Sequence, residues 1–454
     1  MTDTLTKGTK HSLHPSIQRY LANGRREEGA AQTLLQADHL LQLCLEAGAS
    51  DAGFAQITSP HLDGQRQKIL QAYPRTKSLI SFVCRMNTEN VRNPARSAAN
   101  LEFHSTTDET NHVARKIVSA LAKQGVRAIN PASGFPMEME GYPDKQIWLV
   151  AHKPVAVAAS MGKKGIHKNV IHPKFGSFII LGTILLDAEI SPYNTTLDYN
   201  PCLSCKLCVA ACPVGAIHAD GYFNFSACYT HNYREFMGGF SDFVGQIADS
   251  KNAEDLNKKV GLNQIASFWQ SLSFGANYKA AYCLAVCPAG DDIIGQYLSA
   301  KADFLEEIVR PLQRKEETVY VVPKSDAEEY VAKRFPHKKI QHVRSGLNVT
   351  TISGFLRGMP IIFQPGKAAN LNKRYHFIFY GQESAEATVI IKDGRVKVLP
   401  GIQGDADLSI KADSRTWIKF LSNRNHLVAA LITGKIKLKG SPAHLVSFGN
   451  CFVS

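Results

Sequence analysis

Apolar and polar positions in the first half of the chain follow helical and strand periods in turn. The segment AAQTLLQADHLLQLCLEAG places Leu34, Leu35, Leu41, Cys44 and Leu45 on one face of a predicted helix that ends at a glycine. Strands are predicted in DAGFAQI, TKSLISFVCRM, the start of QIWLVAHKPVAVAASMG and GSFIILGTILLDAEI, with helices in ETNHVARKIVSALAKQG and KPVAVAASMG. This alternation predicts an α/β layer over residues 31–199, after a polar, irregular tail over residues 1–30.

The C-terminal third has its own pattern. After the charged run QRKEE, Ser325 and Glu328 form a capping-box signature that opens the predicted helix SDAEEYVAKRF. The segments RYHFIFYG and EATVIIKDGRVKVL alternate as strands do, and Asp393-Gly394 predicts a two-residue hairpin turn. ADLSIKA, the helix SRTWIKFLSN and the strand KIKLKGS complete a separately folded α+β domain over residues 313–454.

Composition points to several modules without a membrane span. A chain of 454 residues with 44% hydrophobic residues is too long for one core. The stretch GSFIILGTILLDAEI is broken by glycine and acid well short of the roughly 20 residues of a span. No apolar stretch near the start resembles a secretory signal, and none follows the pair Arg25-Arg26, so a cytoplasmic location is expected.

The formal charge of +13 is spread along the chain instead of forming one basic tract. This distribution favours an acidic redox partner, a phosphate-bearing cofactor or a lipid headgroup, with a plain role in solubility as the alternative. A nucleic-acid partner is not expected.

Seven of the ten cysteines lie within one stretch of fewer than a hundred residues. The run Cys202-x2-Cys205-x2-Cys208-x3-Cys212-Pro213 has the bacterial ferredoxin spacing, in which three thiolates bind one [4Fe–4S] cluster and the fourth binds another. Cys283-x3-Cys287-Pro288 repeats the second half of that motif, so Cys287 is expected to complete the first cluster. A structural zinc site usually takes two ligand pairs, and disulfides are not expected in a reducing compartment.

The thiolate count leaves a gap in the second cluster. Two cubanes need about eight cysteines, and Cys212, Cys228 and Cys283 leave one iron without a thiolate. His218, His231, an exogenous group or a three-iron cluster are the alternatives. Three further cysteines are distant in sequence and are interpreted as small buried hydrophobes, namely Cys44, Cys84 and Cys451.

Three segments within residues 31–290 resemble the epoxyqueuosine reductase and reductive dehalogenase group of cobalamin-dependent enzymes. They are Gly162-x2-Gly165-x2-Lys168-Asn169, HPKFGSFIILGTILLD and the cysteine module. The resemblance implies a corrin lined by Gly162, Gly165, Lys168 and Asn169, with glycines permitting close approach and Lys163, Lys164 and Lys168 meeting the phosphate-bearing tail. Without the resemblance, GKKGIHKN is a Gly- and Lys-rich loop, which is more often a plain turn.

Two positions depart from that group. Ala151 stands where epoxyqueuosine reductases have an aspartate general acid, so the tRNA-modifying reaction is not expected. His152 and Lys153 are the candidate proton donors in its place, although a hydrogen-bonded structural role is the competing interpretation for His152. Ala280 stands where the second cysteine motif of the group would begin.

Residues 319–454 resemble the sterol carrier protein type 2 lipid-transfer domain, through ADLSIKADSRTWIKFL, ALITGKIKLKG and LVSFG. The resemblance implies a pocket for a lipid or fatty-acyl chain. Candidate lining residues are Trp417, Phe420, Leu431 and Phe448, with Leu421 and Leu427 beside them, and ordinary core packing is the alternative for each.

The expected fold class is α/β (α+β) multidomain: a cobalamin-reductase-like α/β domain (31–199), a two-cluster ferredoxin-like module (200–312) and a sterol-carrier-like α+β domain (313–454). The expected function is an iron–sulfur oxidoreductase that passes electrons through two clusters to a corrin and cleaves a hydrophobic substrate reductively. The alternative is a ferredoxin-type carrier whose lipid domain docks it to a membrane or partner. An electron donor such as a ferredoxin, a flavodoxin or a reductase is implied.

Overall fold

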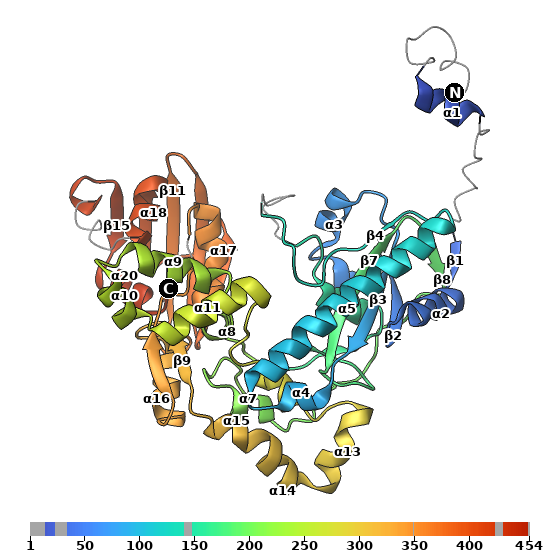
Figure 1. Cartoon of the computed structure of the whole chain (residues 1–454). Helices are drawn as coiled ribbons and strands as arrows, with labels where there is room; N and C mark the ends of the chain where they lie inside the picture. Colours follow the sequence, from blue (N-terminus) through green and yellow to red (C-terminus); the bar gives the residue numbers. More distant parts are fainter. Residues whose placement is uncertain (1–13, 23–33, 140–147, 348, 423–429, 453–454) are drawn as a thin grey trace. The chain divides into compact units, whose positions relative to one another are not determined.

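The computed structural model describes residues 14–22, 34–139, 148–347, 349–422 and 430–452. The chain divides into two compact units (Figure 1). Unit 1 consists of Met1–Arg85, Ser105–Lys163 and Ile179–Tyr199, and unit 2 consists of Met86–His104, Lys164–Phe178 and Asn200–Ser454. None of the described helices is both long enough and apolar enough to cross a membrane.

Unit 1 is built on a four-stranded antiparallel sheet in the order β2-β3-β7-β4. The strands are β2 (Asp51–Gln56), β3 (Ser78–Arg85), β7 (Ile179–Leu186) and β4 (Ala128–Ile129), while β1 (Leu34–Gln36) pairs in parallel with β8 (Glu189–Ser191). The helical elements are α1 (Pro15–Ala22), α2 (Ala37–Ala47), a 3₁₀ turn (Pro60–Leu62), α3 (Arg66–Ala72), α6 (His152–Ala158) and the part of α5 (Arg96–Lys123) from Ser105 onward.

Helices cover both faces of this sheet. Alternate residues of β3, Ile80, Phe82 and Cys84, enter one core with Leu40 of α2 and Ile117 of α5, which lies across the strands in Figure 1. The opposite face receives α6. There Gly53 is required, because a Cβ at this position would lie 2.1 Å from the carbonyl oxygen of Ala159. The predicted α/β layer is confirmed as helix, sheet and helix.

Several local predictions for unit 1 were wrong. Leu34 and Leu35 belong to β1, because they pair with Glu189 and Ile190 of β8, a distant contact that overrides the helical period. Cys44 is buried in the face of α2, whereas Leu45 is 39% exposed. The tail predicted to be irregular contains α1, which starts at Pro15, a residue suited to a first helical turn.

Two further predictions in this half need correction or lie outside the described residues. Helix α5 begins at Arg96, well before ETNHVARK, because Ala99 and Phe103 are buried one turn apart and extend its apolar face. The strand predicted in QIWLV falls mostly on residues 140–147, which lie outside the description, and Trp148–Val150 form no strand.

Unit 2 carries the cysteine segment among short helices. These are α4 (Thr88–Arg92), α7 (Leu207–Ala211), α8 (Phe225–Asn232), α9 (Gly238–Ala248), α10 (Ala253–Lys259), α11 (Leu262–Phe274), α12 (Tyr282–Ala285), α13 (Asp291–Ser299), α14 (Lys301–Phe304), a π-helical turn (Leu305–Val309) and α15 (Arg310–Arg314). The short strands β5 (Lys163–Lys164) and β6 (Val170–Ile171) pair beside them.

The C-terminal part of unit 2 contains a five-stranded sheet in the order β13-β12-β11-β14-β15. The strands are β11 (Lys373–Tyr380), β12 (Ala385–Lys392), β13 (Arg395–Pro400), β14 (Leu408–Asp413) and β15 (Ile436–Gly440); only β11 and β14 pair in parallel. The other elements are β9 (Thr318–Val321), α16 (Asp326–Arg334), β10 (Lys339–His342), α17 (Ile352–Ile362), α18 (Ser414–Ser422) and α20 (Ala443–Asn450).

The turn and cap predictions in this part are confirmed. Asp393 and Gly394 both have positive φ, at 50° and 63°, as a two-residue hairpin between β12 and β13 requires. The hydroxyl of Ser325 accepts a hydrogen bond from the Glu328 amide at 3.2 Å and caps α16. The α+β class of this part therefore follows from local sequence signals.

Candidate metal centre

The first group of cysteines comes from two distant stretches of sequence. Cys202 and Cys205 lie on the loop before α7, Cys208 lies on α7, and Cys287 follows α12, which packs against α7. Burial raises the pKa of the Cys208 thiol, and the nearby thiols of Cys283, Cys287, Cys205 and Cys202 raise it further. The packing of α12 against α7, and of Cys202 and Cys287 within one small cluster around Ile171, brings the two stretches of predicted ligands together.

Backbone geometry in the loop orients these side chains. Ser204 and Lys206 both have left-handed φ values, 56° and 58°, and Lys206 precedes the first residue of α7. The Asn200 side chain accepts the Cys202 amide at 3.0 Å and holds the start of the loop. The loop therefore winds tightly enough for cysteines three residues apart to face a common centre.

Three donors point at cysteine sulfurs. The Ile166 amide donates to Cys202 Sγ at 3.3 Å, and the Ala216 amide donates to Cys212 Sγ at 3.3 Å. The Asn169 side chain donates to Cys283 Sγ at 3.9 Å. Hydrogen bonds to ligand sulfur orient the ligands and tune the reduction potential of an iron–sulfur cluster.

Gly165 lies close to Cys202 of the first group, which leaves little space for a side chain at this position. A Cβ there would lie 2.8 Å from Ile171 Cδ1 and 3.3 Å from Cys202 Sγ. The absence of a side chain therefore lets the loop approach the cysteine itself. The sequence suggested that this glycine makes room for a macrocycle, whereas the observed close contact is with the cysteine module.

Two cysteines of the second group lie near Tyr233, and the third lies near Tyr330. Cys228 lies on α8, Cys283 lies on α12, and both raise the pKa of Tyr233, which burial raises first. Cys212 is buried, and Cys212 raises the pKa of Tyr330 after burial has done so. Ala280 is 6% exposed, and its amide donates to the Asn232 side chain at 3.0 Å. The position of the expected eighth thiolate is thus a buried methyl group.

The two histidines considered for the open iron lie in different settings. His231 Nδ1 accepts the Tyr320 amide at 3.3 Å, so the proton of the neutral ring is on Nε2, and a protonated nitrogen cannot bind iron. Burial lowers the His231 pKa to about 4, which keeps the ring neutral. The His218 ring packs on Tyr222 with centroids 5.0 Å apart. The remaining alternatives are His218, an exogenous ligand or a three-iron cluster.

The thiol environment fits iron–sulfur clusters. Burial raises the pKa of Cys212 and brings that of Cys287 to about 11, so these thiols become thiolates only when a metal displaces the proton. Within the described residues, no three His, Cys, Asp or Glu side chains are close enough to hold a single metal ion. In a cubane each cysteine binds a different iron.

The predicted corrin residues have partners in the cysteine module. Lys168, with φ of 64°, donates from Nζ to the carbonyl oxygen of Gly221 at 2.7 Å. Asn169 donates to Cys283, as described above. In unit 1, Gly162 has φ of 139° and the ammonium group of Lys163 lies 3.8 Å from Asp198. These contacts hold the loop against the cysteines, so they do not by themselves fit a corrin.

The predicted proton donors belong to unit 1. His152 Nε2 donates to the carbonyl oxygen of Ala132 at 3.0 Å, so Nδ1 accepts the Thr183 hydroxyl at 2.9 Å. Burial lowers the His152 pKa, so the ring is neutral and both nitrogens are occupied. This arrangement supports the structural interpretation of His152. Lys153 is exposed on the first turn of α6.

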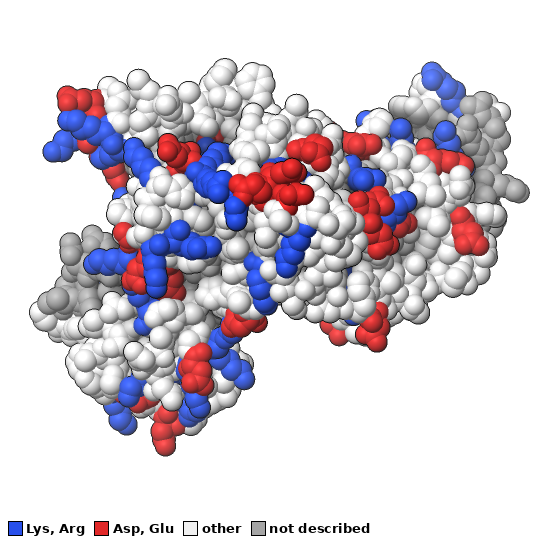
Figure 2. Space-filling model, turned by 90° about the horizontal axis from the view of Figure 1, so that it is seen from below, with Lys and Arg blue, Asp and Glu red and all other residues white. Residues whose placement is uncertain are grey.

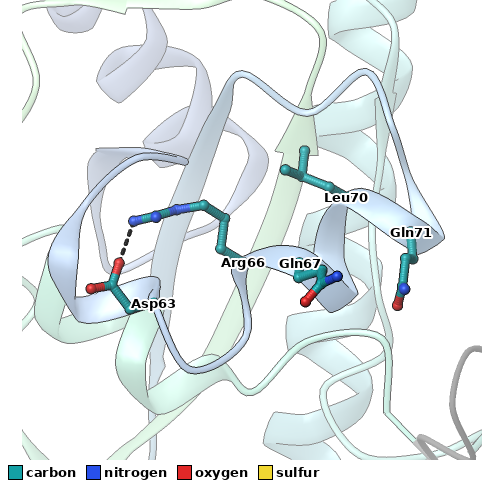
Figure 3. Close-up of a pocket in the computed structure, with 5 residues that line it drawn as sticks. All are labelled: Asp63, Arg66, Gln67, Leu70 and Gln71. Carbon is teal, nitrogen blue, oxygen red and sulfur yellow. Dashed lines mark hydrogen bonds and ion pairs between the residues drawn. The ribbon is translucent and has the colours of Figure 1, made fainter.

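Ala151 is held from both sides by one glutamine. Its amide donates to Gln65 Oε1 at 2.8 Å, and its carbonyl oxygen accepts from Gln65 Nε2 at 3.1 Å. The residues on either side of Gln65 in the sequence line a cavity of about 410 Å³ (Figure 3). Its lining residues are Asp63, Arg66, Gln67, Leu70 and Gln71. The Asp63 carboxylate pairs with Arg66 at 2.5 Å, so an ion pair lines this cavity.

The predicted lipid residues divide between core and surface. Trp417 and Phe448 are 1% and 5% exposed, and both contact Phe377 within one aromatic core. Phe420 packs on Trp417 with ring centroids 5.2 Å apart. Leu431 is 37% exposed and lies outside this core, which leaves the prediction for Leu431 without support. Leu427 lies outside the described residues.

Charged side chains of both signs are interleaved on the face shown in Figure 2. The excess of 52 basic over 39 acidic residues is therefore not gathered into one basic area on that face. This distribution agrees with the charge pattern of the sequence.

Comparison with known proteins matches two separate parts of the chain. The 4Fe-4S binding domain family matches residues 195–218, and the SCP-2 sterol transfer family matches residues 364–452. An epoxyqueuosine reductase of Aliivibrio fischeri is 29% identical over 134 residues, which cover 28% of this chain and 36% of that protein. One from Gloeobacter violaceus is 25% identical over 181 residues, which cover 40% of this chain and 54% of that protein.

The chain joins an epoxyqueuosine reductase-like iron–sulfur region to an SCP-2 domain. The solved epoxyqueuosine reductase from Streptococcus thermophilus is 16% identical and covers 61% of this chain and 78% of that one, with a TM-score of 0.33 that carries no argument here. The chain therefore matches about a third to a half of the length of the two curated relatives named above.

Sequence reasoning missed part of the surroundings of the cysteines. The stretch Met86–His104 lies far from the cysteines in sequence, yet it belongs to unit 2 and its α4 packs against α12. Two arginines of this stretch, the half-buried Arg92 and the buried Arg96, belong to no recognisable motif. Only the rarity of buried arginine could have drawn attention to them, and burial is not readable from a single sequence.

Proposed function

We propose that this chain is an iron–sulfur reductase that passes electrons through two clusters to the reductive cleavage of a hydrophobic substrate. The observation that carries the proposal is the convergence of Cys202, Cys205 and Cys208 with Cys287 of a distant segment. Four buried or half-buried thiols, one of which accepts a hydrogen bond from the Ile166 amide, support the proposal of a redox site.

In this proposal the residues of the chain hold and insulate the clusters. Cys202, Cys205, Cys208 and Cys287 would hold the first cluster, and Cys212, Cys228 and Cys283 would hold three irons of the second. Tyr233 and Tyr278 are half-buried, with ring centroids 5.7 Å apart, and Tyr233 lies near Cys228 and Cys283, where these rings would limit water. The missing thiolate at Ala280 leaves one iron for an exogenous ligand, or yields a three-iron cluster.

Cobalamin is part of the proposal as the electron acceptor, on the resemblance of the Gly162–Asn169 loop and its flanking segments to cobalamin-dependent reductases. Bound cobalamin would supply a reduced cobalt nucleophile. Because the loop's observed contacts are with the cysteine module, no step is assigned to a corrin here. Lys153, exposed at the start of α6, remains the proposed proton donor, with His152 held in its structural hydrogen bonds.

The SCP-2 domain is proposed to bind a hydrophobic ligand that has one polar group. Two buried polar atoms of its aromatic core, Trp417 Nε1 and Tyr375 Oη, have no hydrogen-bond partner among the described residues. An unsatisfied buried donor is costly, and an acceptor on a ligand would satisfy it. Trp417, Phe420 and Phe448 would contact the apolar part of that ligand.

Epoxyqueuosine reduction itself is not proposed, because Ala151 offers no acid and Gln65 holds its backbone. The second candidate is a ferredoxin-type electron carrier with a lipid-binding docking domain. Both ring nitrogens of His152 are engaged in hydrogen bonds. This favours the second candidate, because it leaves only one of the two predicted proton donors.

Anaerobic purification and reconstitution separate these candidates. Iron, acid-labile sulfide and cobalt are measured, and the visible spectrum is recorded with cobalamin added at stoichiometric protein. A reductase predicts clusters together with a changed corrin spectrum on reduction. Reversible cluster reduction with an unchanged corrin spectrum establishes the carrier instead.

A further inference from the structure

Two arginines of unit 2, the half-buried Arg92 and the buried Arg96, lie on the segment that packs against the cysteine module. Arg92 is the last residue of α4, and Arg96 is the first residue of α5. Helix α4 packs against α12, the helix that carries Cys283 and precedes Cys287. Arg92 therefore lies on a helix that packs against the cysteine module, and Arg96, at the start of α5, reaches the same module through Tyr282 of α12.

Arg96 is buried, and two of its three guanidinium nitrogens have no hydrogen-bond partner among the described residues. It is 9% exposed, and its Nη1 donates to the carbonyl oxygens of Val91 at 3.2 Å and Asn93 at 3.3 Å. The guanidinium lies over the Tyr282 ring at 5.3 Å. Its Nε and Nη2 are buried and have no partner among the described residues.

Arg92 has a matching environment. Its Nη1 donates to the Gln296 side chain at 3.1 Å. The guanidinium lies over the rings of Phe178 at 5.4 Å and Phe304 at 5.2 Å. Its Nε and Nη2 are likewise buried with no partner among the described residues.

Neither arginine has a carboxylate within ion-pair distance among the described residues. A buried cation without a counter-ion is costly. Burial accordingly lowers the pKa of both guanidinium groups, although arginine stays charged in proteins. Glu89 and then Cys287 oppose that shift at Arg92, and Tyr282, Glu317 and then Cys283 oppose it at Arg96. Each arginine therefore has one cysteine among the groups that act on its charge.

We propose that Arg92 and Arg96 are the buried countercharges of the two clusters, Arg92 for the first through Cys287 and Arg96 for the second through Cys283. The inference rests on the proposed function only in that the clusters must be bound. A cubane held by thiolates is an anion, and each electron that it accepts adds negative charge. A fixed cation in a site from which water is excluded stabilises the reduced form and raises the reduction potential. The electrons come from the donor protein that the proposed function requires.

The test compares Arg92→Met and Arg96→Met with Arg92→Lys and Arg96→Lys in the full, anaerobically reconstituted chain. Iron content is measured first, and each cluster is then titrated potentiometrically with detection by electron paramagnetic resonance. At a fixed solution potential, the ratio of reduced to oxidised cluster is expected to fall on the order of tenfold for the nearer cluster in each Met variant. The Lys variants, which keep the charge, are expected to stay close to wild type.

Every outcome decides the proposal. Met variants that lose a cluster while the matching Lys variants keep it at the wild-type potential support the countercharge role. Met variants with full clusters and an unshifted potential overturn the proposal. Met and Lys variants that behave alike overturn it too. In both cases the arginines contribute only by packing against the rings of Tyr282, Phe178 and Phe304. Wild-type protein without iron would instead refute the proposed function.

Discussion

The two cysteine groups share one construction but differ in a single residue. The first group has four thiols, whereas the second has Cys212, Cys228 and Cys283 with the buried methyl of Ala280 in the fourth place. Each group has a backbone or side-chain donor aimed at sulfur. Under the proposed assignment, this difference makes the first site complete for a stable electron-transfer cluster, while the second would leave an iron open to exchange.

The largest expected effect separates the first site from every other cysteine. Cys208→Ser should remove the first cluster and lower the iron content by about half, since about four of eight irons belong to it. Cys44→Ala is the matched control, because Cys44 is fully buried in the core of unit 1. Iron and sulfide assays on anaerobic protein measure both. Full iron in Cys208→Ser would break the assignment of the first site.

The next substitution is designed to give the second site the same number of thiolates as the first. Ala280→Cys should supply the missing thiolate, so the second cluster keeps its fourth iron in air and the three-iron resonance signal falls about tenfold. Ala280→Ser, which adds a similar volume with a poorer ligand, is the control. If the signal in Ala280→Cys equals that of wild type, the vacancy lies elsewhere.

A third prediction tests whether His231 compensates for Ala280. The His231 pKa is lowered to about 4 by burial, while an unfolded chain has the ordinary value near 6.5. The unfolded state therefore binds the proton first as the pH falls, and the free energy of unfolding should decrease by up to about 3 kcal/mol from pH 6.5 to pH 4.

His231→Gln should flatten that pH dependence, which denaturant titrations at several pH values measure, and leave the iron content unchanged. A loss of one iron per chain in His231→Gln would show that the histidine does ligate the second cluster and that its Nδ1 contact with Tyr320 is not maintained.

The smallest expected effect concerns the fit of the loop on the first site. Gly165→Ala places a methyl group 2.8 Å from Ile171 Cδ1 and 3.3 Å from Cys202 Sγ, so it should cost about 1 kcal/mol and reduce the occupancy of the first cluster alone. Gly295→Ala in α13 is the control, because nothing lies within 4 Å of its added Cβ. Thermal melting and iron content, compared for the two variants, distinguish a local from a general effect.

Local signals in the sequence predicted the parts that depend on neighbouring residues. The cysteine spacings, the Asp393-Gly394 hairpin and the Ser325 cap need only short-range chemistry, and all of these signals are found in place. Tertiary contacts decided the rest. Leu34 and Leu35 form a strand because β8 is available to pair with them, and Gly165 is fixed by Cys202.

The surroundings of the site could not be predicted for the same reason. Arg92 approaches the cysteines because α4 packs on α12, and Arg96 does so because its guanidinium lies over Tyr282 of α12, far along the chain. The hydrogen bonds of His152 to Thr183 and Ala132 likewise join residues 20 to 31 positions apart. A single sequence contains no periodic signal for such pairs.

The most direct test is metal and sulfide analysis of the full chain purified without air, with resonance spectra before and after brief oxidation. The account predicts about eight irons with matching sulfide, of which one is lost on oxidation as a three-iron signal from the second site appears. Colourless protein, protein that carries zinc in place of iron, or two clusters that resist oxidation equally would contradict it.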